Sequence, residues 1–249
     1  MSDFSGIRAI VTGGASGIGA ATTRLLRERG AVVSVLDVND GTPPDVHAFT
    51  ADLADAAAVE AAVAAAAEAM GGIDVVVNNA GIGAQGTVED NSDDEWHHVY
   101  DINVVGAVRV TRAALPHLRA SASASVVNTC SVAATNGLPA RALYSATKGA
   151  VLALTRAMAT DHVAEGIRVN AVSPGTAATP WVDRLLSTAH DPDAERAALD
   201  RRQAIGRLVT PEEVAEAIAY LASPRNASTT GIVLEVDGGL SHLRVPPES

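Results

Sequence analysis

Tyr144 and Lys148 are the residues of this chain whose types and spacing most directly suggest chemistry. They lie four positions apart in YSATK (144–148), which places both side chains on one face of a helix. A phenol is a poor base at neutral pH, and an adjacent ammonium favours the phenolate, so the pair suits proton abstraction from an alcohol. Lys148 is also the only lysine among the 18 lysine and arginine residues, which indicates a need for a compact ammonium. The alternative is an ordinary lysine on a helix surface.

A glycine-rich segment, TGGASGIG (12–19), predicts a nucleotide site. Gly13, Gly17 and Gly19 permit a tight turn from a strand into a helix and a close approach of the backbone to a pyrophosphate. Asp37 ends the next apolar run. A carboxylate there accepts hydrogen bonds from both hydroxyls of an adenosine ribose and repels a 2′-phosphate, which favours NAD over NADP. The alternatives are a tight turn without a ligand and an acid that faces solvent.

The elements that must position these residues alternate along the chain. Short apolar runs predict strands that are buried on both faces, and longer helical patterns lie between them. The strands are predicted at 7–12, 32–37, 46–51, 73–80, 125–130, 167–173 and 232–238, and the helices at 17–29, 54–70, 92–118, 145–165 and 211–222. This order predicts an α/β fold with a doubly wound, seven-stranded parallel sheet in a single Rossmann domain over 1–249. Residues 176–206 are rich in Arg and Asp and predict a partly helical lid over the substrate.

The composition excludes several classes of function. A net charge of -11 argues against nucleic acid or an anionic membrane as a partner. Cys130 is the only cysteine, so no disulfide forms within the chain, which fits the cytoplasm. We expect no signal peptide and no membrane span. We also expect no metal site, because no His, Cys and carboxylate cluster has ligand spacing and the adjacent His97 and His98 diverge on a helix.

Several motifs together resemble the short-chain dehydrogenase/reductase family over nearly the whole chain. These are TGGASGIG, NNAG (78–81), Asn103, Ser131, the Tyr144–Lys148 pair, PG (174–175) and VDGG (236–239). The resemblance implies a homotetrameric enzyme in which Tyr144 is the acid/base, Lys148 tunes it and Ser131 holds the substrate oxygen. It also implies that Asn103 supports a water that relays protons, although a buried Asn bonded to the backbone is a compatible alternative.

The resemblance also implies a set of residues that bind the cofactor. Asp52 and Leu53 resemble the adenine contact, and the segment 79–81 resembles the one beside the adenosine ribose. The loop after 173 resembles the one that orders the nicotinamide. The complete predicted set is Gly13, Ser16, Gly17, Ile18, Gly19, Asp37, Asp52, Leu53, Asn79, Ala80, Gly81, Tyr144, Lys148, Pro174, Gly175, Thr176, Ala177 and Thr179.

Three arginines are candidates for the substrate site. Arg141 lies three positions before Tyr144, and Arg184 and Arg202 lie in the predicted lid. Arginine suits bidentate binding of a carboxylate. The segment 174–208 is similar to a branch that acts on hydroxy and keto acids, such as type 2 hydroxybutyrate and 2-keto-3-deoxy-fuconate dehydrogenases. That resemblance implies carboxylate binding by Arg141 and Arg202. Its third arginine falls on Leu185, one place after Arg184.

The sequence therefore predicts an NAD-dependent dehydrogenase whose small substrate bears a carboxylate. Salt bridges on a solvated lid helix are the alternative interpretation of the arginines. In that case the substrate is a neutral sugar, a cyclic alcohol or an acyl thioester. A non-catalytic nucleotide sensor is a further alternative, although it has no use for Ser131, Tyr144, Lys148 and Asn103 together. Trp181 opens the lid and covers either substrate or protein.

Overall fold

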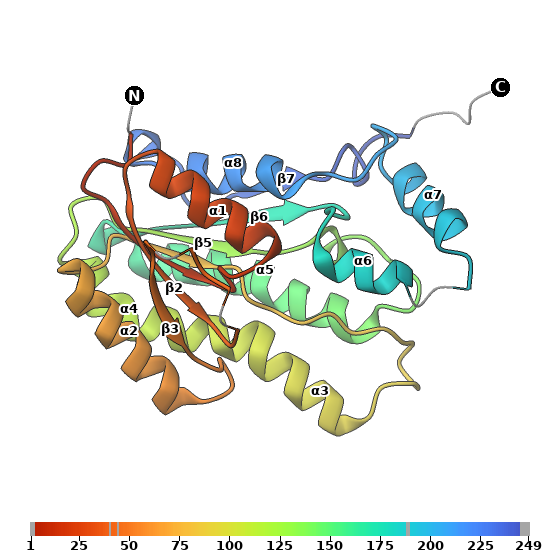
Figure 1. The fold of residues 1–249 in the computed structure, drawn as a ribbon, viewed down its shortest axis with the longest axis horizontal. Coiled ribbons are helices and arrows are strands. Elements are labelled where there is room, and N and C mark those ends of the chain that lie inside the picture. Colours follow the sequence, from red (N-terminus) through yellow and green to blue (C-terminus); the bar gives the residue numbers. More distant parts are fainter. Residues whose placement is uncertain (1–2, 40, 44, 188–189, 245–249) are drawn as a thin grey trace.

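Seven parallel strands form one sheet in the order β3-β2-β1-β4-β5-β6-β7 (Figure 1). The structure is a computed structural model that describes residues 3–39, 41–43, 45–187 and 190–244. The strands are β1 (Arg8–Thr12), β2 (Val32–Asp37), β3 (His47–Thr50), β4 (Val75–Asn78), β5 (Ser125–Thr129), β6 (Arg168–Pro174) and β7 (Val233–Val236). The order reverses between β1 and β4, and the predicted doubly wound fold is confirmed.

Helices cover both faces of the sheet. They are α1 (Gly17–Glu28), α2 (Ala56–Met70), α3 (Asp93–Tyr100), α4 (Gly106–Arg119), α5 (Ala142–His162), α6 (Pro180–Ser187), α7 (Pro192–Arg202) and α8 (Pro211–Ala222). Shorter turns are η1 (Asp101–Val105), η2 (Val132–Ala134), η3 (Val163–Glu165) and η4 (Pro224–Asn226). Figure 1 shows α1 and α8 above the sheet and α2 and α4 below it.

Alternate side chains of each strand enter two separate cores. Val76 of β4 packs with α2, α4 and α5, whereas its neighbour Val77 packs with α1 and α8. Both are fully buried, as the pleat of a strand covered on both faces requires. The two cores fix the strands, and the strands in turn fix the loops at their carboxyl ends. In this fold ligands bind at those loops.

Two helices differ from the sequence prediction. The predicted helix 92–118 is interrupted by the π-helical turn η1, whose wider i→i+5 spacing leaves no signature in hydrophobic periodicity. α5 begins at Ala142 and not at 145, so Tyr144 lies in its first turn. Arg141 precedes this helix without a side-chain cap, which is why no capping residue marked the start.

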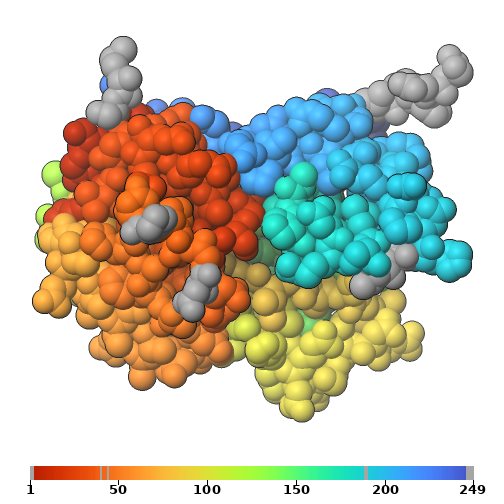
Figure 2. Space-filling model, viewed as in Figure 1, coloured from red at the N-terminus to blue at the C-terminus, as the bar shows by residue number. Residues whose placement is uncertain are grey.

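α6 and α7 lie beyond the carboxyl end of β6, in the segment predicted as a lid. Val182, Leu199 and Leu208 pack together there in a small core of their own. Figure 2 shows α6 (teal) on the same face as the first β-α unit (red to orange) and the segment after β4 (yellow). These three parts of the chain meet at the centre of that face. No helix in the described ranges has the length and apolar character to span a bilayer.

A partly buried ion pair joins the amino ends of β1 and β4, at the edge opposite these loops. The Asp74 carboxylate accepts hydrogen bonds from Arg8 Nε (2.7 Å), Arg8 Nη2 (2.7 Å) and Ser121 Oγ (2.6 Å). Burial alone would raise the pKa of Asp74, but the bonds from Arg8 and Ser121 hold it below its ordinary value. The charged carboxylate therefore stabilises the fold above its unfolded-state pKa of about 3.9.

We expect Asp74→Asn to lower the free energy of unfolding at pH 7 by about 3 kcal/mol, because it leaves Arg8 without its counter-charge. The deficit should shrink as the pH falls through the folded-state pKa of Asp74, where the wild-type carboxylate is also neutral. Urea unfolding of wild type and Asp74→Asn at pH 7 and at pH 3 measures this difference in the free energy of unfolding at each pH. Glu212→Gln, in the exposed pair with Arg24, is the control. Equal stability of wild type and Asp74→Asn at pH 7 would contradict the prediction.

Candidate active site

The turn between β1 and α1 leaves little space for side chains at its glycines. A Cβ at Gly19 would lie 2.0 Å from the carbonyl oxygen of Gly13, and Gly17 has a φ of +52°. Ser16 precedes α1 with an extended backbone and no side-chain cap, so the first N–H groups of the helix are not capped by it. This is the cradle that a pyrophosphate needs: a bare backbone at the positive end of a helix. Ile18 packs on the core behind the turn.

Asp37 is held against this turn at the end of β2. Its carboxylate accepts hydrogen bonds from the backbone N–H of Ala15 (3.0 Å) and of Asn39 (3.0 Å). These two donors fix the carboxylate beside the glycine-rich segment, where an adenosine ribose would lie. The donors and the acid together fit the ribose of a dinucleotide.

The first part of NNAG fastens β4 to the same turn. Asn79 donates to the carbonyls of Thr12 (3.1 Å) and Gly13 (3.3 Å), and Thr12 Oγ1 accepts from the backbone N–H of Asn79 and of Ala80. The predicted contact for the ribose and the predicted pyrophosphate turn therefore form one rigid unit.

The predicted adenine contact lies after β3. Asp52 Oδ1 accepts from the backbone N–H of Ala54 (2.9 Å), and Leu53 is buried. Arg109 of α4 donates to the Leu53 carbonyl (2.8 Å) and pairs with Asp101, the first residue of η1. Sequence reasoning missed Arg109, because an arginine inside a helical pattern looks like a surface residue. The contact links the adenine segment to the turn that carries Asn103.

Tyr144 and Lys148 share one face of α5 as predicted. The Lys148 ammonium lies 5.7 Å from the centre of the Tyr144 ring and donates to the Thr129 carbonyl (2.8 Å) at the end of β5. Lys148 is 5% exposed, and none of the ion pairs in the described part of the chain includes it. Cys130 donates from Sγ to the Lys148 carbonyl (3.3 Å), and burial raises the pKa of this thiol. The ammonium is thus buried, hydrogen-bonded to the backbone and near the ring of Tyr144.

Asn103 lies in η1 and ties three elements together. Its side chain accepts from the Ile82 N–H (2.8 Å), donates to the Ile82 carbonyl (2.9 Å) and donates to Thr147 Oγ1 (3.1 Å). Thr147 in turn donates to the Tyr144 carbonyl (2.8 Å). The side chain is therefore bonded to protein, which was the compatible alternative to the relay role. π-Helical turns occur frequently at functional sites.

Ser131 follows β5 and precedes η2, which packs against α5. Its Oγ accepts from the Ala133 N–H (3.1 Å), so the hydroxyl proton stays available for a substrate oxygen. On the far side, the loop after β6 returns to the glycine-rich turn. Gly175 N–H donates to the Val236 carbonyl (3.0 Å), Ala177 pairs with Val209, and Thr179 lies against Gly17. Pro174, Thr176 and Thr179 thus border the same space from the other edge.

Two of the three candidate arginines are neighbours. Burial and the nearby positive charge of Arg202 both lower the pKa of Arg141, whereas Tyr144 and Glu195 act in the opposite sense. Arg141 comes from the residue before α5 and Arg202 from the end of α7, 61 positions apart in the sequence. In the described part of the chain neither forms an ion pair with a carboxylate. Arg184 lies on α6, as does Leu185. Two guanidinium groups that feel each other's charge, neither of them in an ion pair among the described residues, suit an anion.

Comparisons with known proteins agree with this geometry. The family model described as "Enoyl-(Acyl carrier protein) reductase" matches residues 13–241. The cis-4-hydroxycyclohexanecarboxylate dehydrogenase of Sinomonas cyclohexanicum is 42% identical over 242 residues, which are 93% of this chain and 95% of that protein. The chain belongs to the short-chain dehydrogenase/reductase family.

Other members of this short-chain dehydrogenase/reductase family are similar along their whole length. The 2-(S)-hydroxypropyl-CoM dehydrogenase 3 of Xanthobacter autotrophicus is 37% identical, with 94% of this chain and 96% of that one covered. The ligand-free structure of Thermoplasma acidophilum aldohexose dehydrogenase has a TM-score of 0.94 and 32% identity, over 100% of this chain and 98% of that one. The chain is an oxidoreductase of alcohols and ketones that uses a nicotinamide dinucleotide.

Proposed function

We propose that this enzyme is an NAD-dependent dehydrogenase that interconverts the secondary alcohol and the ketone of a small hydroxy acid or sugar-derived acid. The observation that carries the substrate class is the pair Arg141 and Arg202, two neighbouring guanidinium groups without a carboxylate partner among the described residues. The carboxylate in the name of the Sinomonas relative supports the same class.

The residues divide the reaction between them. When bound, a nicotinamide dinucleotide supplies hydride transfer at the alcohol carbon. Tyr144 takes the hydroxyl proton of the substrate as a phenolate, and returns a proton in the reduction. The adjacent Lys148 ammonium stabilises that phenolate, and Ser131 donates a hydrogen bond to the substrate oxygen. Asn103 holds the Ile82 segment and α5 together and supports the proton relay toward Lys148.

Family membership and the composition support the remaining parts of the proposal. We expect a homotetramer in the cytoplasm. The sole cysteine, Cys130, is buried, and therefore a location that keeps thiols reduced is compatible with the fold.

An initial-rate screen tests the proposal. NAD or NADP is offered with hydroxy acids such as cis-4-hydroxycyclohexanecarboxylate, each paired with its methyl ester or neutral alcohol. We expect turnover of acids with NAD and at least 10-fold lower kcat/KM for the neutral partners. Preference for neutral alcohols or aldohexoses would instead assign the substrate class to which the Thermoplasma relative's name points. Binding of NADH without turnover of any substrate would favour a nucleotide sensor.

The preference for NAD depends on Asp37. We expect Asp37→Ser to raise the ratio of kcat/KM for NADP to that for NAD by about 100-fold, because it removes a fixed negative charge from beside the 2′ position. Steady-state kinetics with both cofactors gives the ratio. Glu60→Gln, on the exposed face of α2, is the control for a change of net charge. An unchanged ratio would show that Asp37 does not select the cofactor.

A further inference from the structure

Trp181, the second residue of α6, lies on a surface that is shaped to receive its ring. A Cβ at Gly83 would lie 2.7 Å from Cζ2 of this indole, a contact that real side chains do not make. Gly83 has no positive φ, so its backbone does not itself require glycine. The absent side chain at position 83 is therefore explained by the space that the ring of Trp181 takes, 98 positions along the sequence.

The other neighbour of the indole is Arg141. The guanidinium carbon lies 5.8 Å from the ring centre, within the range of a cation–π interaction. Arg141 Nη1 donates to the Ala84 carbonyl (3.3 Å), so the ring and this carbonyl hold the guanidinium from two sides. We call Gly83, Trp181 and Arg141 the Trp181 stack.

The backbone beneath the Trp181 stack is also fixed. Gly86 N–H donates to the Ala140 carbonyl (3.0 Å), and Ala142 N–H donates to the Gly86 carbonyl (3.2 Å). Ala140 has a φ of +50°, the one such non-glycine residue in the described ranges. Residues with a side chain rarely adopt this conformation, and such residues cluster at ligand sites. The next residue, Arg141, faces the ring of Trp181.

We propose that Trp181 is a positioning residue, which fastens α6 to the loop after β4 and holds the Arg141 guanidinium ready for the substrate carboxylate. This inference rests on the proposed carboxylate substrate. The stack fixes the guanidinium before substrate arrives, so less rotamer freedom is lost on binding. Trp181 is 41% exposed, so the stack is not sealed from solvent.

The test separates positioning from a merely structural role. We expect Gly83→Ala, which displaces the ring and leaves Trp181 intact, to raise KM for a hydroxy acid by roughly 10-fold at nearly constant kcat. KM for its neutral alcohol partner should stay within about 2-fold. The KM of Trp181→Phe for the hydroxy acid should lie between the values of wild type and Trp181→Ala, because a smaller ring retains part of the cation–π interaction. Gly137→Ala is the control, because a Cβ at Gly137 meets nothing within 4 Å.

A fluorescence titration provides a second readout that needs no turnover. Trp181 and Trp96 are the only two tryptophans of the chain, so Trp96→Phe leaves Trp181 as the sole reporter. The probe is cyclohexanecarboxylate, which has the carboxylate but no hydroxyl to oxidise. We expect saturable emission changes in the presence of NADH, with a Kd that Gly83→Ala raises by the same factor as KM.

Two outcomes would overturn the inference. They differ in whether the proposed function also fails. If Arg141→Ala raises KM for acids but Gly83→Ala and Trp181→Ala do not, the guanidinium needs no stack, and the proposed function stands. If Arg141→Ala leaves KM for acids unchanged, no carboxylate binds there. The positioning role of Trp181 then fails, and the proposed substrate class fails with it where Arg202→Ala also leaves KM for acids unchanged.

Discussion

Lys148→Arg is expected to lower kcat about 100-fold, although it keeps the positive charge. The ammonium is enclosed: it donates to the Thr129 carbonyl at 2.8 Å, and a Cβ at Gly81 would lie only 3.7 Å from it. A planar guanidinium is larger and presents its donors in a fixed fork, so it cannot take the same place beside Tyr144. Lys148→Met also removes the charge that favours the phenolate. We expect it to lower kcat by about 1,000-fold.

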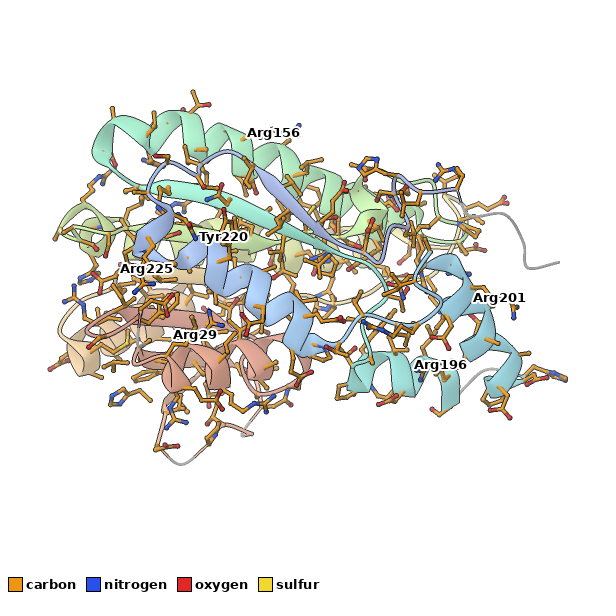
Figure 3. The ribbon with its side chains drawn as sticks, turned by 90° about the horizontal axis from the view of Figure 1, so that it is seen from above. Arg29, Arg156, Arg196, Arg201, Tyr220 and Arg225 are labelled. Atoms are coloured by element: carbon orange, nitrogen blue, oxygen red, sulfur yellow. The ribbon has the colours of Figure 1, made fainter. Side chains whose placement is uncertain are left out.

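The measurement is kcat with saturating cofactor and substrate, and thermal unfolding shows that the variants fold. Arg156→Lys is the matched control, on the same helix but exposed (Figure 3). A wild-type kcat in Lys148→Met would show that Lys148 takes no part in the reaction. Wild-type kcat in Lys148→Arg alone would show that only the charge matters.

Arg141→Ala and Arg202→Ala are each expected to raise KM for hydroxy acids by 10- to 100-fold, roughly, at little change in kcat. A hydrogen bond to a charged group contributes about 1.5–3 kcal/mol, which corresponds to this range. The two guanidinium groups are neighbours, so their effects should not add independently. Steady-state kinetics on both single variants and the double variant measures the coupling.

A control for this experiment lies directly beside Arg202. Arg201 is exposed on α7 and lies with Arg196 at the edge of the molecule (Figure 3). Arg201→Ala removes the same charge from the same helix, and we expect KM for acids to stay within about 2-fold. Neutral alcohols should respond to none of the three single variants. Equal effects of Arg201→Ala and Arg202→Ala would mean that α7 acts only through its net charge.

The inner strands were predictable because they are buried on both faces, whereas the edge strands β3 and β7 are partly exposed. A run such as VVSVLD (32–37) has no polar side to obscure it, and the structure begins and ends β2 at the same residues. The helices were less predictable where their geometry departs from 3.6 residues per turn. The π-helical turn at Asp101–Val105 leaves Asn103 in place but joins two helices that looked like one.

Some residues of the candidate site could likewise be predicted from the sequence, and others could not. Tyr144 and Lys148 are four positions apart, so local geometry predicts their shared face. Arg141 and Arg202 come together only through the folded chain; their places before Tyr144 and in the predicted lid made them candidates, and the family resemblance then implied that both bind the carboxylate. The contact between Gly83 and Trp181 left no mark that one sequence could reveal. A glycine that makes room for a distant ring looks like any other glycine in a loop.

The single buried lysine also gives the chain a built-in probe of unfolding. A protease that cuts only after lysine has one target in all 249 residues, and it would release fragments 1–148 and 149–249. That bond lies inside α5, beside a side chain that is 5% exposed, so the helix must open before the protease can bind it. Appearance of the two fragments would therefore count openings of the catalytic helix, and a bound cofactor and substrate would slow it.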